Sequence, residues 1–471
     1  MKNFKINSNL STKNKNRFLK DKIKIFLKEK SLKYLMNFLS KNFNMKLKDI
    51  EFYIQKKFFF SYNLNQNKFE NKINIFYAPK YLVLYLIFYF FFLFKKKTEY
   101  KKQKYLLLID EVYEQTNLNY YKKLINCYKK NQVCFRSNVE NLKIKNASQI
   151  KWSLFNCNKP KNFISIGFKL LFISFFLTFK YKINFFNIIL IFLKDYVFFD
   201  SLYSKYQFKN IIRYIHYFSN NIERAILQKK YPDSKINLIQ KNIDNYAQIG
   251  WFYDCDNFFC FSKKSQVVRK NGNIGKIIPV GSFIMDSRFY INKSKKKYDK
   301  LDIIYFGGNN LHPVSYYDNH KDYAKCYENH LDWLKKLSLE FPNLKIGFKH
   351  HGTKDQFYEK KYLNDSKIIF VDDKINSYDL INASKIVLSF CSTMVIEARS
   401  LNKPAFFLNP EKKNNQFMDC LKHSNKIFIS DYKSLKSIKK KFVDKKNNIK
   451  PFEFCLYSKD VSLKIYNIIN N

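Results

Sequence analysis

One helix-like segment carries the residues of this sequence that are best spaced for chemistry. In SFCSTMVIEARSLNKPAFFLNP, residues 389–410, Ser392 and Thr393 follow an apolar run and Glu397 stands four residues after Thr393. Residues four apart share a helix face, so the hydroxyls and the carboxylate are predicted to point toward one pocket. If Ser392 caps the helix, a capping-box acid would stand at Val395, so Glu397 has another role.

These residue types suit a nucleotide diphosphate. A helix start offers unpaired N–H groups and a positive dipole end to phosphate. A carboxylate one turn further along can accept hydrogen bonds from ribose hydroxyls. The alternative is that Glu397 is solvated or paired with a lysine, but its position between two apolar runs favours the ligand role.

A regular alternation of strands and helices must position this segment. From Leu301 onward, the predicted strands are LDIIYF, LKIGFKH, KIIFVDD, KIVLSF, PAFFL and KIFIS, and the predicted helices are 325–340, 377–384, 392–401 and 432–442. This rhythm predicts a parallel sheet covered by helices, and the continuous apolar runs indicate strands buried on both faces. Ligands of such sheets bind outside the carboxyl ends of the strands. The further candidate binding residues are therefore Gly307, Gly308, Lys349, His350 and His351.

The N-terminal half predicts a second α/β domain. KYLLLID, residues 104–110, is typical of a strand, and it ends in an acidic loop with Asp110, Glu111 and Glu114, which are candidates for a general base. Further strands are predicted at 132–135, 235–240, 256–262 and 276–282.

Glycine is scarce, so GNIGKIIPVGS marks the clearest boundary, and a hinge is predicted near Gly281–Ser287. The predicted parts are a basic extension with an apolar membrane-interface segment (1–100), an N-terminal acceptor-side domain (101–285), a C-terminal nucleotide-binding domain (286–450) and a C-terminal helix (451–471).

Composition excludes several classes of protein. The 471 residues carry a formal charge of +48, but the lysines are spread along the chain without the clustered arginines of a nucleic-acid groove, so no nucleic-acid partner is expected. Nine scattered cysteines without a C-x-x-C pair argue against disulfides and zinc and for a reducing cytoplasm. The first residues lack the apolar stretch of a secretory signal.

Two apolar segments raise the possibility of membrane contact. Residues 81–94 are fourteen uninterrupted apolar residues followed by three lysines, and they would reach only about 21 Å as a helix. That length is too short to cross a bilayer, and Pro79 is expected to block its extension. The second segment, 163–199, is aromatic but broken by lysines. Both are predicted either to pack in the core or to dock peripherally on an anionic membrane at its cytoplasmic face, and a true membrane span is the remaining alternative.

Several of these motifs together resemble GT-B glycosyltransferases of bacterial capsule and lipopolysaccharide biosynthesis. SFCSTMVIEARSLNKPAFF looks like the nucleotide-sugar-binding element of their C-terminal domain, with Asn402 where the family usually has glycine. FKHHG (348–352) is similar to their K-x-H turn, IIPVGSFIMD (277–286) to the segment that opens their second domain, and LIQKNID (238–244) to a changed Q-H-G-I turn with Lys241 in place of histidine.

The resemblance implies two Rossmann-like domains that face a cleft. It implies a glycosyltransferase that uses a nucleotide-sugar donor and a glycan or lipid-linked acceptor, with no cofactor and no metal. In this interpretation His350 and Lys349 contact the leaving phosphates, and His350 is counted among the catalytic residues. Asp254-Cys-Asp256 matches a metal-binding D-x-D but precedes a strand where that motif should follow one. The alternatives are a polyol-phosphate transferase, a sugar-nucleotide epimerase and a non-catalytic relative.

Overall fold

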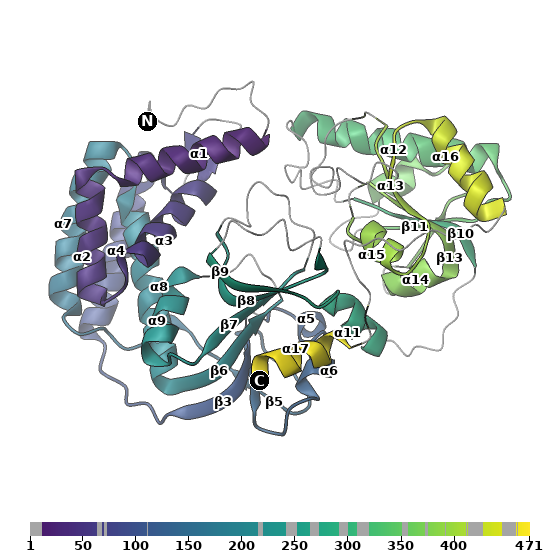
Figure 1. The fold of residues 1–471 in the computed structure, drawn as a ribbon. Helices are drawn as coiled ribbons and strands as arrows, with labels where there is room; N and C mark the ends of the chain where they lie inside the picture. Colours follow the sequence, from purple (N-terminus) through teal and green to yellow (C-terminus); the bar gives the residue numbers. More distant parts are fainter. Residues whose placement is uncertain are drawn as a thin grey trace.

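The described part of the chain forms two groups of elements in this computed structural model, each built around one parallel sheet (Figure 1). The structure describes residues 12–63, 68–69, 73–110, 112–214, 220–241, 252–263, 273–291, 300–308, 320–350, 357–372, 375–390, 392–410, 412, 427–444, 458 and 460–471.

The first sheet has seven parallel strands in the order β5-β4-β3-β6-β7-β8-β9. The strand order reverses between β3 and β6, which opens a crevice at their carboxyl ends. Five of the strands coincide with predicted ones, whereas β5 and β6 were not predicted. The boundary of β6 was hard to see because this strand follows a long apolar helix without a break. The strands are β3 (Gln103–Ile109), β4 (Val133–Arg136), β5 (Ala147–Ile150), β6 (Tyr206–Arg213), β7 (Lys235–Ile239), β8 (Asp254–Cys260) and β9 (Asn273–Pro279).

The predicted separate N-terminal extension is not confirmed, because the described helices within residues 12–60 and 78–94 belong to a helical layer on this sheet. Their buried leucines and aromatics share one core with strands of the sheet. On α2, for example, Leu32, Leu35, Met36 and Leu39 follow the spacing of a single buried helix face. The layer consists of α1 (Thr12–Leu27), α2 (Lys30–Phe43), α3 (Leu47–Phe60), α4 (Ala78–Phe94), α7 (Phe163–Tyr181), α8 (Phe185–Lys205) and α9 (Asn221–Lys230).

Two helices of this layer are long and apolar enough to cross a membrane by length and composition, at Ile75–Phe94 and Phe163–Tyr181. From the sequence, the first apolar segment is expected to be too short to cross a bilayer, and this expectation about its length was wrong. Pro79 lies in the first turn of α4, where its missing N–H removes no helical hydrogen bond, and the 3-10 turn η3 (Ile75–Tyr77) extends the element backward. The element therefore reaches about 30 Å, and length alone does not decide how it meets a membrane.

The second sheet has six parallel strands in the order β12-β11-β10-β13-β14-β15. Each coincides with an apolar run that the sequence predicts as a strand, and helices cover the sheet as the βαβ rhythm requires. The strands are β10 (Leu301–Phe306), β11 (Ile346–Lys349), β12 (Ile369–Phe370), β13 (Ser384–Ser389), β14 (Ala405–Leu408) and β15 (Phe428–Ile429). The helices are α12 (His320–Glu340), α13 (Phe357–Tyr362), α14 (Ser377–Ala383), α15 (Met394–Ser400), α16 (Tyr432–Lys439) and the following η9 (Lys440–Asp444).

A turn lies in the region predicted as a hinge, before a helix that still packs against the N-terminal group. Gly281, at φ 104°, has the left-handed conformation that favours glycine, and it leads from β9 into α11 (Phe283–Ile291). The last helix, α17 (Val461–Asn470), returns to the N-terminal group and packs against α11 and α6 (Lys122–Ile125) (Figure 1). The described α/β architecture with two parallel sheets is therefore the one predicted.

A buried carboxylate connects α11 with α17 and α6. Asp286 of α11 accepts hydrogen bonds from the backbone N and the Oγ of Ser462, at 2.9 and 2.8 Å, and Lys123 Nζ lies 2.6 Å from its other oxygen.

The remaining short elements are β1 (Tyr62–Asn63), β2 (Lys68–Phe69), α5 (Gln115–Asn119) and η4 (Leu154–Asn156).

Candidate active site

A cavity of about 340 Å³ lies where residues of both groups meet at the carboxyl ends of the strands. Its volume is within the range of small-molecule sites. Six of the residues predicted from the sequence line it: Gly307, Lys349, His350, Ser392, Thr393 and Glu397. The remaining lining residues are Tyr214, Lys241, Ile284, Arg288, Phe306, Ser377, Tyr378 and Met394.

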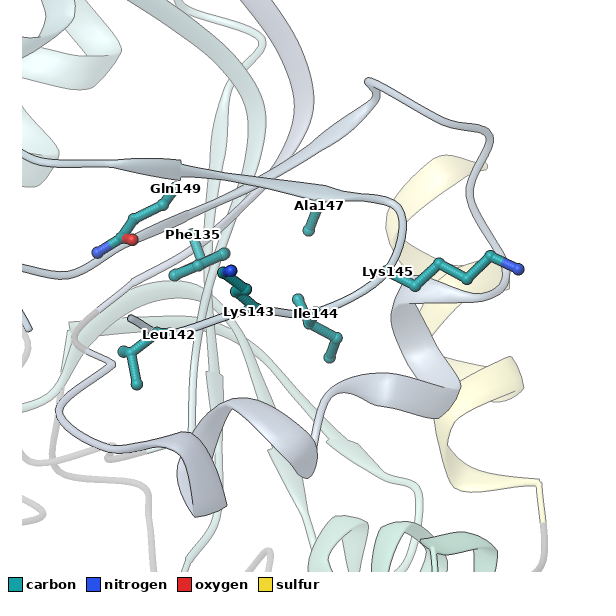
Figure 2. A pocket seen from close by; sticks show the side chains of 7 residues that line it. All are labelled: Phe135, Leu142, Lys143, Ile144, Lys145, Ala147 and Gln149. Atoms are coloured by element: carbon teal, nitrogen blue, oxygen red, sulfur yellow. The ribbon is translucent and has the colours of Figure 1, made fainter. Parts of the chain in front are cut away.

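A second cavity lies beside the edge strand β5 and is built from one side of the N-terminal sheet. Figure 2 shows its lining side chains, which come from β4, from β5 and from the loop between them: Phe135, Leu142, Lys143, Ile144, Lys145, Ala147 and Gln149. These side chains include no carboxylate, imidazole or hydroxyl. We therefore take the cavity between the two groups as the candidate site.

Glu397 lies one turn inside α15 and is almost fully buried. The hydroxyl of Tyr378, on α14, donates a hydrogen bond to its Oε2. Burial raises the pKa of Glu397 to about 7, although this hydrogen bond and the charge of Arg288 act in the opposite direction. The carboxyl can therefore gain or lose a proton near neutral pH.

The two hydroxyl residues lie at the beginning of α15, one position later than predicted for the cap. Thr393 occupies the N-cap position without a side-chain capping bond, and Ser392 Oγ accepts a hydrogen bond from the backbone N of Met394 at 3.2 Å. The helix has only seven residues. Polar side chains and charges of the cavity, more than a helix dipole, must then recognise a ligand.

The paired glycines after β10 lie where the backbone approaches another element closely. A Cβ at Gly307 would stand 3.1 Å from both Phe348 Cζ and Tyr327 Oη, and the backbone N of Gly308 donates to Tyr327 Oη at 3.3 Å. Gly307 lines the cavity and Gly308 follows it. Packing leaves little room for a side chain at 307, and contact with a ligand stays a prediction.

The predicted K-x-H turn carries a partner that the sequence did not reveal. His350 is buried, and its Nδ1 lies 3.2 Å from Oε1 of Glu359, a fully buried acid on α13. Tyr327 donates a hydrogen bond to the same Oε1 at 3.0 Å. Glu359 stands in the otherwise exposed-looking stretch FYEKKY, so no spacing or apolar pattern marks it. His351 lies outside the described residues.

Two cationic side chains line the cavity although the sequence did not mark them as site residues. Lys241 stands out in the sequence only as a departure from the family turn, and Arg288 is not among the predicted site residues. Lys241, in the changed Q-H-G-I turn, lies 5.4 Å from the ring centre of Tyr214, and burial lowers its pKa. Arg288 of α11 donates to Tyr120 Oη at 2.6 Å and lies 5.7 Å from the ring centre of Tyr378. It therefore contacts both groups of elements beside the cavity.

The predicted acidic loop separates into residues with different surroundings. Asp110 is buried and forms ion pairs with Arg136 and Arg213, and Arg213 also contacts Glu223 at 2.5 Å. Burial disfavours the charged carboxylate, but the two arginines outweigh this effect and hold the pKa of Asp110 below its ordinary value. A group with a low pKa and both oxygens paired is a poor general base, so the geometry argues against the predicted catalytic role of Asp110.

The rest of that loop leaves one accessible acid. Glu114 is exposed. Its negative charge raises the pKa of Lys241, whereas burial lowers that pKa, so Glu114 interacts electrostatically with a lysine that lines the cavity. Glu111 lies outside the described residues. Glu114 therefore stays a candidate base.

The D-x-D sequence lies away from the strand ends that form the cavity. Asp254 begins β8 and pairs with Arg224 at 2.5 Å, and Asp256 pairs with the same arginine at 2.6 Å. Among the residues that the structure describes, no three His, Cys, Asp or Glu side chains are grouped to hold a metal ion.

No protein-family model matches the chain, and no curated protein matches it. Among solved structures, it is similar to UDP-GlcNAc 2-epimerase from Neisseria meningitidis bound to UDP-GlcNAc, at 11% identity and TM-score 0.47, covering 78% of this chain and 100% of that one. It is also similar to UDP-GlcNAc 2-epimerase from Methanocaldococcus jannaschii, at 12% identity and TM-score 0.46, covering 78% of this chain and 99% of that one. A third similar structure is the wall teichoic acid polymerase TagF, at 10% identity and TM-score 0.41, covering 84% of this chain and 96% of that one. Likeness this distant carries no conclusion about the chemistry of this chain.

Proposed function

We propose that the protein is a glycosyltransferase that moves a sugar from a nucleotide-activated donor to a glycan or lipid-linked acceptor. One observation carries this proposal: residues of two α/β units line a single cavity at the carboxyl ends of their strands, and cations, hydroxyls and one carboxyl meet there. A site shared by two units can bind the donor on one side and the acceptor on the other.

The charges of the cavity suit the donor. Lys241, Arg288 and Lys349 line it and complement the negative charge of a diphosphate. Glu397, with the hydroxyls of Ser392 and Thr393, offers hydrogen-bonding partners to a ribose. Together these groups match a nucleoside diphosphate better than an apolar ligand or a single free anion.

The same charges can assist transfer. When the bond between the sugar carbon and the diphosphate oxygen breaks, its electron pair goes to the diphosphate, and fixed cations stabilise that charge. The acceptor oxygen bonds to the sugar carbon and must lose its proton. His350 is the buried base of the cavity, and the neighbouring carboxylate of Glu359 favours the protonated imidazole that results.

Two alternatives use a similar site. An epimerase would require paired acids around the sugar, whereas Glu397 is the single carboxyl residue among the described residues that line the cavity. This favours transfer over epimerisation. A polyol-phosphate transferase would share the phosphate-binding cations and differ in the donor, so a comparison of donors separates it from a glycosyltransferase.

A donor panel tests the proposal directly. Nucleoside diphosphates, UDP-, GDP- and ADP-sugars and CDP-glycerol are each added to the full-length protein, and the melting temperature is recorded. A nucleotide sugar that raises the midpoint, and whose hydrolysis or transfer is lost in His350→Ala with binding retained, supports the proposal. Stabilisation by CDP-glycerol alone, or by no nucleotide at all, contradicts it.

A further inference from the structure

Helices α4 and α7 present an apolar face to solvent in addition to the apolar face that each buries. On α7, the buried residues Ile166, Leu170 and Leu177 alternate with exposed phenylalanines at helical spacing. On α4, buried Tyr85 and Phe88 alternate with exposed residues in the same way. Prominent exposed members of the two stripes are Ile87, Phe90, Phe168, Phe172, Phe176 and Phe179. Exposed apolar surface of this kind marks an interaction site.

The two stripes form one surface because the helices pack closely and run antiparallel. Tyr85 Oη donates to the carbonyl of Gly167 at 2.7 Å, and Tyr89 Oη donates to the carbonyl of Ile164 at 2.8 Å. A Cβ at Gly167 would stand only 2.4 Å from the ring of Tyr89. The absence of a side chain at 167 thus lets Tyr89 lie across α7 and join the two stripes.

The charges around this surface identify its partner. No acidic residue occurs at 71–98 or at 141–194, the stretches that contain both helices. Two copies of such a surface would bring like charges together, whereas an anionic bilayer offers opposite charge to the lysines and an apolar layer to the phenylalanines. Exposed or half-buried lysines of these stretches include Lys80, Lys95, Lys96, Lys97, Lys169 and Lys180.

The inner sides of both helices argue for docking in the plane of the bilayer and against crossing it. They pack against α8, which continues directly into β6 of the sheet. Asp195 of α8 accepts hydrogen bonds from Tyr53 at 2.9 Å and from Asn220 at 3.0 Å, so polar groups fix the layer that covers α4 and α7. A span would have to bring these groups into lipid.

We infer that the paired face of α4 and α7 is a membrane-docking surface for an anionic bilayer, such as the cytoplasmic leaflet of the cell membrane. Figure 1 shows α4 and α7 at the opposite end of the N-terminal group from the second sheet. Docking there leaves the cavity between the two groups open. The inference is independent of the proposed function, since it concerns lipid and requires no nucleotide.

Vesicle sedimentation with the purified full-length protein tests this surface. We expect binding to phosphatidylcholine vesicles that contain phosphatidylglycerol, weak binding to phosphatidylcholine alone, and release by high salt or alkaline carbonate. The double variant Phe172→Glu/Phe176→Glu should lose about tenfold or more in affinity. Both phenylalanines are 59% exposed, and Leu339→Glu on α12, where the leucine is 56% exposed, is the matched control that should bind like the parent.

Circular dichroism and melting temperature establish that the variants are folded. Three outcomes would overturn the inference. The folded double variant could bind as well as the parent, the parent could resist carbonate extraction like a spanning protein, or light scattering could show a dimer that the double variant abolishes while vesicles bind neither protein.

Discussion

At the scale of single residues, Glu397 has the strongest link between sequence and proposed ligand. Replacing it with glutamine keeps the shape and removes the charge that would accept hydrogen bonds from ribose hydroxyls. We expect a loss of about 1.5–3 kcal/mol in nucleotide binding, which is about a ten- to hundredfold weaker affinity. Calorimetry with the nucleotide found in the donor panel measures it, and unchanged affinity in folded Glu397→Gln would remove the donor-site assignment.

The same carboxyl predicts how stability depends on pH. Its pKa rises from 4.5 to about 7 on folding, so the folded state binds the proton more tightly than the unfolded state. This contribution is therefore fully present below about pH 4.5 and is lost as the pH rises to about 7, by up to about 3 kcal/mol. In Glu397→Gln the unfolding free energy should lack this decrease. Chemical denaturation of both proteins at a series of pH values checks it, and parallel curves would contradict it.

Asp110 is expected to act on stability and not on proton transfer. Asp110→Asn leaves Arg136 and Arg213 without their shared carboxylate, and we expect a loss of about 3–5 kcal/mol in unfolding free energy. Glu140 is the control, since it forms an exposed pair with Lys151 and its replacement by glutamine should cost less than about 1 kcal/mol. A stable but inactive Asp110→Asn would instead restore the catalytic prediction.

At the scale of elements, the packing of α4 on α7 depends on one glycine. Gly167→Ala would place a Cβ against the ring of Tyr89, and we expect the unfolding free energy to fall by about 1–3 kcal/mol. In a Tyr89→Ala background the clash is absent, and the same change should stabilise by up to about 1 kcal/mol through helix propensity. Denaturant unfolding of the four proteins measures this sign reversal, and equal effects in both backgrounds would show that the two residues do not interact.

At the scale of the whole molecule, the C-terminal sheet has its own core, whereas α17 completes the core of the N-terminal group. The strands of the second sheet bury their apolar residues largely among residues 301–443, but Val461, Ile465 and Ile469 pack with the first sheet. We expect residues 286–450 to fold when expressed alone. Removal of residues 451–471 should lower the melting temperature of the N-terminal group and leave that of the C-terminal group unchanged.

Limited proteolysis and calorimetry test this division. Proteolysis should cut near the predicted hinge and leave a C-terminal fragment, and the intact chain should show two melting transitions. A substitution at Asp286, such as Asp286→Ala, should lower the same transition as the truncation, because it removes the hydrogen bonds to Ser462. An unfolded fragment 286–450 would contradict the division.

Local sequence determined the second sheet and much of the first. Runs such as LDIIYF and KIVLSF are short, mostly apolar and include β-branched residues, which is the pattern of strands buried on both faces, so their positions could be predicted without the fold. The same reasoning placed Lys349, His350, Ser392, Thr393 and Glu397 at one edge, because parallel strands present all their carboxyl ends there.

The tertiary structure alone decided the partners of these residues. Arg288 between the two groups and Asp110 between its arginines are brought together by elements far apart in the chain, and no spacing encodes such contacts. Glu359 stands only nine residues after His350, but no apolar or helical pattern marks it as the partner of that side chain. It also decided which apolar surface is left exposed. α4 and α7 carry apolar residues on more than one side, so their packing against α8, against each other and, for α7, against α2 determines which face meets solvent.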